Sequence, residues 1–428
     1  MNIASYPTYD SYKDSGVEWI GDLPTSWDVE RGKWLFVKKD RPVRPDDEIV
    51  TCFRDGQVTL RNNRRTDGFT NALKEHGYQG IRKGDLVIHA MDAFAGAIGV
   101  SDSDGKATPV YSACVPREPD TVDPYFYAYY MRHIALSGLL VSLAKGIRER
   151  STDFRYNDFA DLQLAVPSRP EQRAIAAFLD EKCAKVDGAV RIKEEQIALL
   201  RERRQILIQQ AVTRGLNPDA PMKDSGIDWI GQIPAHWEVK PLLTEAKIKS
   251  RTGRPDLQLL SVYLGLGVVK FDDVEEKRTN ATSLDLSNYQ VVEPGDLVLN
   301  NQQAWRGSVG VSFETGIVSP AYIVLELSDR FEPEFANFYF RVGTTVAHYL
   351  IHSKGVGTIQ RNLYRPKLKR ALVTIPPLDE QRGIVQHINS ECEKIDNAIR
   401  IKEDQIAALK EYKTSLINAA VTGKIKVA

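Results

Sequence analysis

The feature that most constrains the fold of this chain is an internal duplication. The segment KDSGVEWIGDLPTSWDV begins at Lys13 and KDSGIDWIGQIPAHWEV begins at Lys223, with ten of seventeen positions identical at an offset of 210 residues. A second pair, SRPEQRAIAAFLDEKCAKVD from Ser168 and PLDEQRGIVQHINSECEKID from Pro377, repeats at an offset of 209. A period this long does not fit a solenoid, so a domain plus a connector occurs twice.

Between the conserved segments, each half is predicted to be a mixed α/β (α+β) domain. KGDLVIH at Lys83 is echoed by PGDLVLN at Pro294, and such short apolar runs bounded by Gly and Asp are typical of strands. Aromatic-rich runs after Asp123 and Glu332 indicate helices. We therefore predict a first domain at 1–167, whose opening motif spans 13–29, and a second at 217–376, whose opening motif spans 223–239. The connectors are predicted helices at 168–216 and 377–428.

Each connector carries a seven-residue apolar repeat. The apolar positions of the first are Leu179, Cys183, Val186, Val190, Ile197, Leu200, Leu207 and Ala211. Those of the second are Ile388, Cys392, Ile395, Ile399, Ile406, Leu409, Leu416 and Ala420. A repeat this regular needs a partner stripe, and roughly 38 residues at about 1.5 Å each make a rod near ~57 Å, long for a compact domain. We predict two long helices paired as an antiparallel coiled coil, which separates the two globular domains and relates them by a pseudo-twofold axis.

Four polar residues interrupt the heptad stripes at matched places: Lys193, Arg204, Lys402 and Lys413. They either set the register of the pair or place their charges at the edge of the seam. In the opening motifs, four tryptophans are expected to pin the motif onto the helix pair: Trp19, Trp27, Trp229 and Trp237.

Composition narrows the class of protein. The chain has 57 basic and 57 acidic residues, which argues against a protein that coats nucleic acid without specificity. Its four cysteines show no CxxC spacing, so neither a zinc site nor a disulfide framework is indicated. The polar start carries no apolar signal region, and no uncharged apolar run is long enough to span a membrane. We expect a cytoplasmic protein with reduced thiols and no membrane partner.

Motifs for catalysis are missing from the sequence: no P-loop, HExxH or nucleophile elbow occurs. One loose pattern, Asp256 followed by Glu275 and Lys277, resembles a metal-dependent nuclease site. The first half has no copy of it, and the last two residues lie in the charged stretch DDVEEKR, so chance explains it better. We predict no catalytic residue and no metal site.

Basic clusters with polar neighbours recur at matched places in both halves, such as KGIRERSTDFR at Lys145 and KGVGTIQRNLYRPKLKR at Lys354. Arg, Asn and Gln can bind base edges in pairs of hydrogen bonds, while Lys and Arg bind phosphates. We predict base contacts in the loop after each GDLV strand and in the basic segment before each long helix. The first-domain candidates are His89, Asp92, Arg148, Arg150 and Arg155. The second-domain candidates are Gln302, Gln303, Arg306, Gln360, Arg361 and Asn362.

The doubled KDSGxxWIG and EQR segments, and the IKEEQIALL segment with its counterpart IKEDQIAAL, resemble the specificity (S) subunit of type I restriction–modification enzymes, over the whole chain. The resemblance implies two target-recognition domains that each read one half of a split, asymmetric site in double-stranded DNA. It also implies that the helix pair acts as a spacer and docks two modification subunits, which transfer methyl groups from S-adenosylmethionine to adenine. Restriction subunits would add an ATP- and Mg²⁺-dependent nuclease. This chain would then hold no cofactor and catalyse nothing itself.

Two alternatives stay open at the level of sequence. A coiled-coil adaptor without a DNA role would leave the basic clusters as solvated faces, and specific DNA binding would exclude it. A nuclease built on Asp256, Glu275 and Lys277 would cleave DNA in a metal-dependent assay on the isolated chain.

Overall fold

The fold is taken from a computed structural model that describes residues 3–64, 76–143, 153–274, 285–351, 353–356, 360–363, 368–369 and 371–427. The chain divides into two compact units. The first comprises Met1–Lys193 with Glu403–Ala428, and the second comprises Glu194–Lys402. Each unit therefore contains one globular domain, part of the helix that follows it and part of the other long helix.

The first unit is built from short strands and helices. Its elements are η1 (Ile3–Ser5), β1 (Tyr12–Asp14), β2 (Asp22–Pro24), β3 (Asp28–Arg31), α1 (Gly32–Leu35), β4 (Phe36–Lys38), β5 (Val50–Cys52), β6 (Val58–Leu60), η2 (Arg61–Asn63), β7 (Gln79–Ile81), β8 (Leu86–His89), η3 (Ala93–Ala95), β9 (Ile98–Val100), β10 (Gly105–Ala107), β11 (Tyr111–Pro116), α2 (Pro124–Leu136), α3 (Leu139–Leu143), α4 (Tyr156–Asp161), β12 (Gln163–Val166) and the first part of α5 (Arg169–Arg214).

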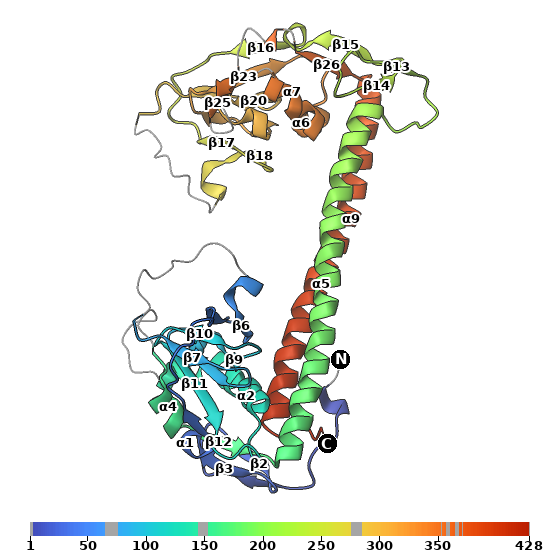
Figure 1. The fold of residues 1–428 in the computed structure, drawn as a ribbon. Helices are drawn as coiled ribbons and strands as arrows, with labels where there is room; N and C mark the ends of the chain where they lie inside the picture. The colour runs from blue at the N-terminus through green and yellow to red at the C-terminus, as the bar shows by residue number, and fades with distance from the viewer. Residues whose placement is uncertain are drawn as a thin grey trace. The chain divides into compact units, whose positions relative to one another are not determined.

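A four-stranded antiparallel sheet in the order β4-β11-β8-β9 lies at the centre of the first domain (Figure 1). Both faces of β8 are covered, which explains its unbroken apolar run. Leu86 and Ile88 belong to one core cluster with Phe126 of α2, whereas Val87 belongs to a second cluster with Val58 of β6. Successive side chains of β8 thus point to opposite faces of the sheet, and each face belongs to a different core cluster.

The second unit repeats this plan. Its elements are β13 (Met222–Asp224), β14 (Gln232–Pro234), β15 (Glu238–Pro241), η5 (Leu242–Thr244), β16 (Ala246–Lys249), β17 (Leu260–Tyr263), β18 (Gly267–Lys270), η6 (Phe271–Asp273), β19 (Gln290–Val292), β20 (Asp296–Asn300), η7 (Ala304–Arg306), β21 (Val309–Val311), β22 (Gly316–Val318), β23 (Tyr322–Leu327), α6 (Pro333–Arg341), α7 (Gly343–Ile351), β24 (Ser353–Val356), β25 (Gln360–Leu363), β26 (Leu372–Ile375) and part of α9 (Leu378–Val421). Its central sheet has the order β16-β23-β20-β21, which matches the first domain strand for strand.

Helices α5 and α9 pack on each other in antiparallel orientation (Figure 1). In the first unit, Leu179 near the start of α5 shares a core with Leu416 near the end of α9. In the second unit, Ala211 near the end of α5 shares a core with Ile388 near the start of α9. The predicted mixed α/β fold with a paired set of long helices is confirmed.

Helix α5 has 46 residues and α9 has 44, so each is longer than its heptad stripe. The added turns lie before the heptad stripe, where Ile175 and Ile384 are fully buried in the domain cores. Burial against a domain, rather than against the partner helix, therefore stabilises the start of each helix, and a heptad count does not detect it.

The predicted stripe positions are buried or half-buried. The buried members are Leu179, Val186, Val190, Ile197, Ala211, Ile388, Ile395, Ile406, Leu416 and Ala420, together with Cys183 and Cys392. The half-buried members are Leu200, Leu207, Ile399 and Leu409.

Three of the four polar interruptions, Lys193, Arg204 and Lys413, bind the opposite helix. Lys413 Nζ lies 2.7 Å from both carboxylate oxygens of Asp187 in the first unit. Arg204 Nε lies 3.6 Å from Asp396 Oδ1 in the second unit. Arg204 corresponds to Lys413 and Asp396 to Asp187 at an offset of 209 residues. Two matched ion pairs across one seam favour the interpretation that these positions set the register of the helices.

A buried glutamine anchors the start of each long helix to its domain. The Gln172 amide donates to the carbonyl groups of Thr121 at 3.0 Å and Pro167 at 2.9 Å, and its oxygen accepts from the Asp123 N–H at 2.7 Å. Gln381 makes the three matching bonds in the second unit, at 2.7, 2.8 and 2.8 Å, with Arg330, Pro376 and Glu332. These bonds explain why both copies of the EQR segment carry a glutamine.

Replacing Gln381 by Ala is expected to lower the free energy of unfolding of the chain by about 2–4 kcal/mol, because three backbone groups lose their buried partner. Urea denaturation of the full chain measures the change. Arg382→Ala is the matched control, since that side chain is 62% exposed and its loss should change stability by no more than about 0.5 kcal/mol. Equal midpoints for the two variants would contradict the anchoring role.

The opening motifs dock where the two helices meet a domain. Trp27 and Trp237 are fully buried in the clusters that contain Leu416 and Ile388 respectively. Trp237 Nε1 also donates to Glu380 of α9 at 3.1 Å. These two of the four tryptophans thus fasten the start of each domain to the long helices. Trp19 instead lies against Tyr130 of α2, and Trp229 is partly buried against the second-domain core.

Within the described residues, no helix has the length and hydrophobicity needed to cross a membrane.

Candidate nucleic-acid interface

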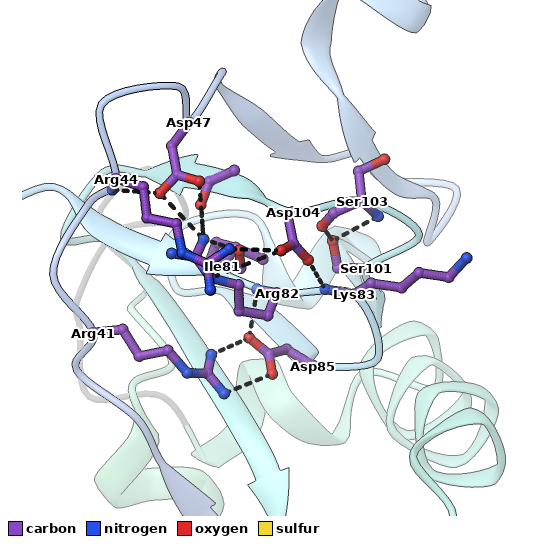
Figure 2. Close-up of polar contacts among 11 residues, drawn as sticks. Arg41, Arg44, Asp47, Ile81, Arg82, Lys83, Asp85, Ser101, Ser103 and Asp104 are labelled. Carbon is purple, nitrogen blue, oxygen red and sulfur yellow. Dashed lines mark hydrogen bonds and ion pairs between the residues drawn. The ribbon is translucent and has the colours of Figure 1, made fainter.

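A buried aspartate holds the turn at the start of each GDLV strand. Asp85 binds the Arg41 guanidinium at 2.5 and 3.1 Å and accepts the Arg82 backbone N–H at 2.8 Å (Figure 2). In the second domain, Asp296 binds Lys249 Nζ at 2.9 and 3.0 Å and accepts a backbone N–H in the same way. The acidic residue of the motif is therefore structural, and it positions the strand that leads to the loop.

A second ion pair extends this network in the first domain. Arg82 Nη1 lies 3.0 and 3.1 Å from the carboxylate oxygens of Asp47 and also donates to the Gly105 carbonyl at 3.0 Å (Figure 2). Only 4% of the Asp47 side chain and 14% of the Arg82 side chain are exposed. The contacts tie the β4–β5 loop to β10 and to the turn between β7 and β8.

We call residues 89–96 the first recognition loop and residues 300–307 the second recognition loop. Both begin at the last residue of a central strand, β8 or β20, contain one 3-10 turn and end at a glycine in the left-handed region, with φ of 92° at Gly96 and 103° at Gly307. Residues with a Cβ are strained there, which explains the glycines. Each loop is closed by a matched backbone bond, His89 N–H to Ala97 at 3.1 Å and Asn300 N–H to Ser308 at 3.0 Å.

The structure brings the two predicted base-contacting segments of each domain together. In the first domain, the Phe154 N–H donates to the Ala90 carbonyl of the first recognition loop at 3.0 Å. In the second domain, the Leu363 N–H donates to the Asn301 carbonyl of the second recognition loop, also at 3.0 Å. Phe154 and Leu363 are 209 positions apart and both are buried. The same backbone contact therefore places Phe154 and Leu363, the described residues of the two basic segments that make it, beside the loops.

The candidates of the first domain have different surroundings. The His89 ring packs on Tyr111 at 4.5 Å, its Nδ1 accepts the Asp92 N–H at 3.0 Å, and burial lowers the pKa of the imidazole. The Asp92 carboxylate binds Arg54 at 2.8 Å. Arg155 is 77% exposed and contacts Asp153 at 2.6 Å. His89 and Asp92 therefore shape the loop, whereas Arg155 presents its charge to solvent.

Two further candidates, Arg148 and Arg150, lie outside the described residues. Among the described residues of the first domain, a hollow of about 510 Å³ lies beside the first recognition loop. Its lining includes Lys38, Met91 and Arg155. It thus lies between the first recognition loop and the segment that precedes α4.

The candidates of the second recognition loop are accessible. Gln302, Gln303 and Arg306 are exposed. The indole of Trp305 donates to the Gln302 carbonyl at 2.9 Å, and the Arg306 guanidinium lies 5.3 Å from the centre of the Trp305 ring. The loop backbone is thereby held while its amide and guanidinium groups remain available.

Strand β25 carries the other second-domain candidates, Gln360, Arg361 and Asn362. Asn362 is exposed, and the side chains of Gln360 and Arg361 lie outside the described residues.

One element of this surface, the hairpin upstream of each GDLV strand, was not predicted from the sequence. Arg54 in the β5–β6 turn binds Asp92 of the first recognition loop. In the second domain, Leu264 of the β17–β18 turn lies against Gly307, 3.4 Å from where a Cβ would stand. The Asp55-Gly56 pair between two short apolar runs is a hairpin signal that could have identified the first of them.

The nuclease alternative receives little support from the part of the chain that the structure describes. The Arg254 guanidinium binds Asp256 at 2.6 and 2.8 Å, and this hydrogen bonding lowers the pKa of the Asp256 carboxyl. Glu275 and Lys277 lie outside the described residues. No group of three potential metal ligands occurs among the residues described.

Comparison with known proteins identifies relatives that span nearly the whole chain. The type I restriction enzyme MjaVIII specificity subunit of Methanocaldococcus jannaschii is 25% identical over 426 residues, covering 95% of this chain and 94% of the relative. MjaX of the same organism, provisionally named a type I restriction enzyme specificity subunit, is 23% identical over 431 residues, covering 95% and 96%. No protein-family model matches the chain.

Two solved structures share the fold. One is a chain from a study of complex assembly and conformational transition of the type I restriction–modification system, with a TM-score of 0.64, 16% identity, and coverage of 93% of this chain and 98% of that one. The other is the HsdS subunit from Thermoanaerobacter tengcongensis, with a TM-score of 0.53, 18% identity, and coverage of 94% and 98%.

The fold thus places the chain in a class of tandemly duplicated mixed α/β proteins with a long helix pair. Its homologues within that class are type I restriction enzyme specificity subunits, and the resemblance predicted from the doubled motifs is confirmed.

Proposed function

We propose that this chain is the DNA sequence-specificity subunit of a type I restriction–modification enzyme. Each domain recognises one half of a bipartite, asymmetric site in double-stranded DNA, and the helix pair docks the catalytic subunits. The chain is a non-catalytic subunit of the complex.

One observation carries the proposal. The recognition loop and the basic segment are joined by the same backbone bond in both domains, Phe154 to Ala90 and Leu363 to Asn301, yet the exposed side chains on that frame differ. A protein that binds two unlike half-sites with two like domains needs a shared frame with different base-contacting groups.

The partners follow from the duplicated scaffold. Each unit contains one opening motif, the start of one long helix and the end of the other, so two equivalent docking places fit two modification subunits. In the proposed complex these subunits transfer a methyl group from S-adenosylmethionine to adenine. Restriction subunits add the nuclease, which uses ATP and Mg²⁺, and this chain holds no cofactor of its own.

Replacing Gln302, Gln303 and Arg306 together by Ala is expected to relax recognition of the second half-site only. Each lost bidentate base contact should weaken discrimination at one base pair by about 1–3 kcal/mol. Methylation mapping with the modification subunits present measures the change at every base position.

The control for this variant is Lys247→Ala, which removes an exposed cation from β16 of the same domain. It should leave both half-sites unchanged. Unaltered methylation of the second half-site by the triple variant would refute the assignment of the loop. An electrophoretic shift that detects no sequence-specific binding by the wild-type complex would favour the adaptor alternative.

A further inference from the structure

Two exposed leucines stand at the tip of the β17–β18 hairpin. The strands pair in antiparallel register with Tyr263 opposite Gly267, and residues 264–266 form the turn. Leu264 is 62% exposed and Leu266 is 58% exposed. Two leucines gathered on one short turn leave apolar area in water that a bound partner would cover.

The hairpin is fixed to the second recognition loop. Ser308, directly after the loop, donates its hydroxyl to the Val262 carbonyl of β17 at 2.8 Å. At the tip, Leu264 Cδ1 lies 3.4 Å from the position that a Cβ on Gly307 would occupy. A ligand that reaches Gln302 and Arg306 on this loop therefore meets the hairpin tip as its neighbour.

Arg341, the last residue of α6, binds the backbone at the tip of the hairpin. The Arg341 guanidinium donates to the Gly265 carbonyl, and its Nη1 would lie 3.3 Å from a Cβ on Gly267. Burial and the nearby charge of Arg204 both lower the pKa of Arg341. The Arg341 guanidinium thus holds the turn, and the positively charged Arg204 lies close to Arg341.

The tip borders a basic hollow of about 520 Å³. Leu264 lines it together with Arg204, Arg306 and Arg341, and Phe338 and Val346 supply apolar wall. Among the described residues no carboxylate lines the hollow, although Asp396 pairs with Arg204 at 3.6 Å. Such a surface is complementary to a polyanion that also presents apolar groups.

Double-stranded DNA has both properties. Its phosphates bind arginine, and the 5-methyl group of thymine is the apolar feature of the major groove. We propose that the β17–β18 tip is a third base-contacting element of the second domain, in which Leu264 and Leu266 contact thymine methyl groups. This inference rests on the proposed function and adds a specificity determinant to it.

The first domain carries a different tip on the same support. Arg132, 209 positions before Arg341, lies beneath the β5–β6 turn, so a Cβ on Gly56 would meet its Cδ at 2.5 Å. The turn itself presents Arg54, which is 69% exposed, in place of leucines. The two hairpin turns thus contact equivalent arginines but expose different side chains. This is expected of an element that distinguishes two half-sites.

The test uses the full-length chain with its modification subunits and a duplex that carries the mapped site. Thymines of the second half-site are replaced one at a time by deoxyuridine, which keeps the hydrogen-bonding groups and lacks the methyl. The wild-type complex is expected to bind about fourfold more weakly for each contacted methyl that is removed. The Leu264→Ala/Leu266→Ala variant should bind the thymine duplex as weakly as the wild-type complex binds the deoxyuridine duplex. Its affinity should not fall further when thymine is replaced by deoxyuridine.

Ile248→Ala is the control, because it removes another exposed apolar side chain from the same domain, and it should keep the wild-type response. Three results would overturn the inference: a wild-type complex insensitive to deoxyuridine, a double-leucine variant that keeps the full response, or a second half-site without thymine. A variant that binds weakly yet still responds to deoxyuridine would show that the leucines contact the DNA away from the thymine methyl groups, and it too overturns methyl recognition. Absence of any sequence-specific binding by the wild-type complex would refute the proposed function itself.

Discussion

A chain that ends after Leu216 is expected to form a symmetric dimer and, with modification subunits, to methylate a palindrome built from the first half-site. In the full chain, the core of the first unit is completed by the end of α9, through Leu416, Ala420 and Val421. The truncated chain lacks these residues, and an uncovered stripe of this size is unstable in water.

A second copy of the truncated chain can supply the missing surface. The residues 209 positions earlier, at the end of α5, are Leu207, Ala211 and Val212, identical to the three that are lost. Arg204 of the second copy likewise stands where Lys413 pairs with Asp187 in the full chain. Both the apolar and the charged contacts can therefore be rebuilt in an isologous interface.

Light scattering measures the state of the truncated chain, and methylation mapping identifies the site that it directs. Recognition of the original asymmetric site should be lost completely. The same chain with Leu207→Asp and Ala211→Asp serves as the control and should stay monomeric. A folded monomer of the unsubstituted truncation, or a dimer that still directs methylation to the asymmetric site, would show that the repeat is not the functional unit.

Inserting four helix-forming residues after Leu200 is expected to abolish methylation of the original site. On α5, Asp187 and Arg204 are 17 positions apart, and their partners on α9, Lys413 and Asp396, are also 17 apart. The insertion lengthens one helix by about 6 Å between the two ion pairs. The pairs cannot then form together, and the heptad stripe beyond the insertion rotates away from its partner.

A matched second insertion after Leu409 restores equal lengths on both helices. This double variant is expected to regain folding and to direct methylation to a site whose half-sites are about 6 Å farther apart, close to two base pairs. Methylation mapping compares the two variants. Unchanged spacing together with full activity in either variant would contradict the proposal that the helix pair sets the distance between half-sites.

Much of the scaffold was predictable because its signals are local or periodic. The heptad positions from Leu179 onward and from Ile388 onward repeat every seven residues, so the helices and their need for a partner stripe follow from the order of residues alone. The offset of about 209 residues then indicates which stripe is the partner. Strands such as β8 and β20 were predictable because apolar runs between Gly and Asp have few other structures available.

The contacts that assemble the candidate interface depend on where the backbone goes. Nothing in the sequence places Phe154 beside Ala90, or the β17–β18 tip beside Gly307, because each contact joins segments more than 40 residues apart. The same holds for His89: its residue type suggested a base contact, and only the packing of Tyr111 against its ring shows that it supports the loop.

The sequence by itself thus determined the duplication, the helix pair and the class of fold, since each is encoded by a repeat or a period. Only the tertiary structure decided which side chains share a surface. Ile175 and Ile384 are buried in the domain cores and anchor the helix starts there. Arg341 binds the β17–β18 turn, which carries two exposed leucines beside the second recognition loop. Such contacts arise from packing between distant segments, for which a single sequence carries no periodic signal.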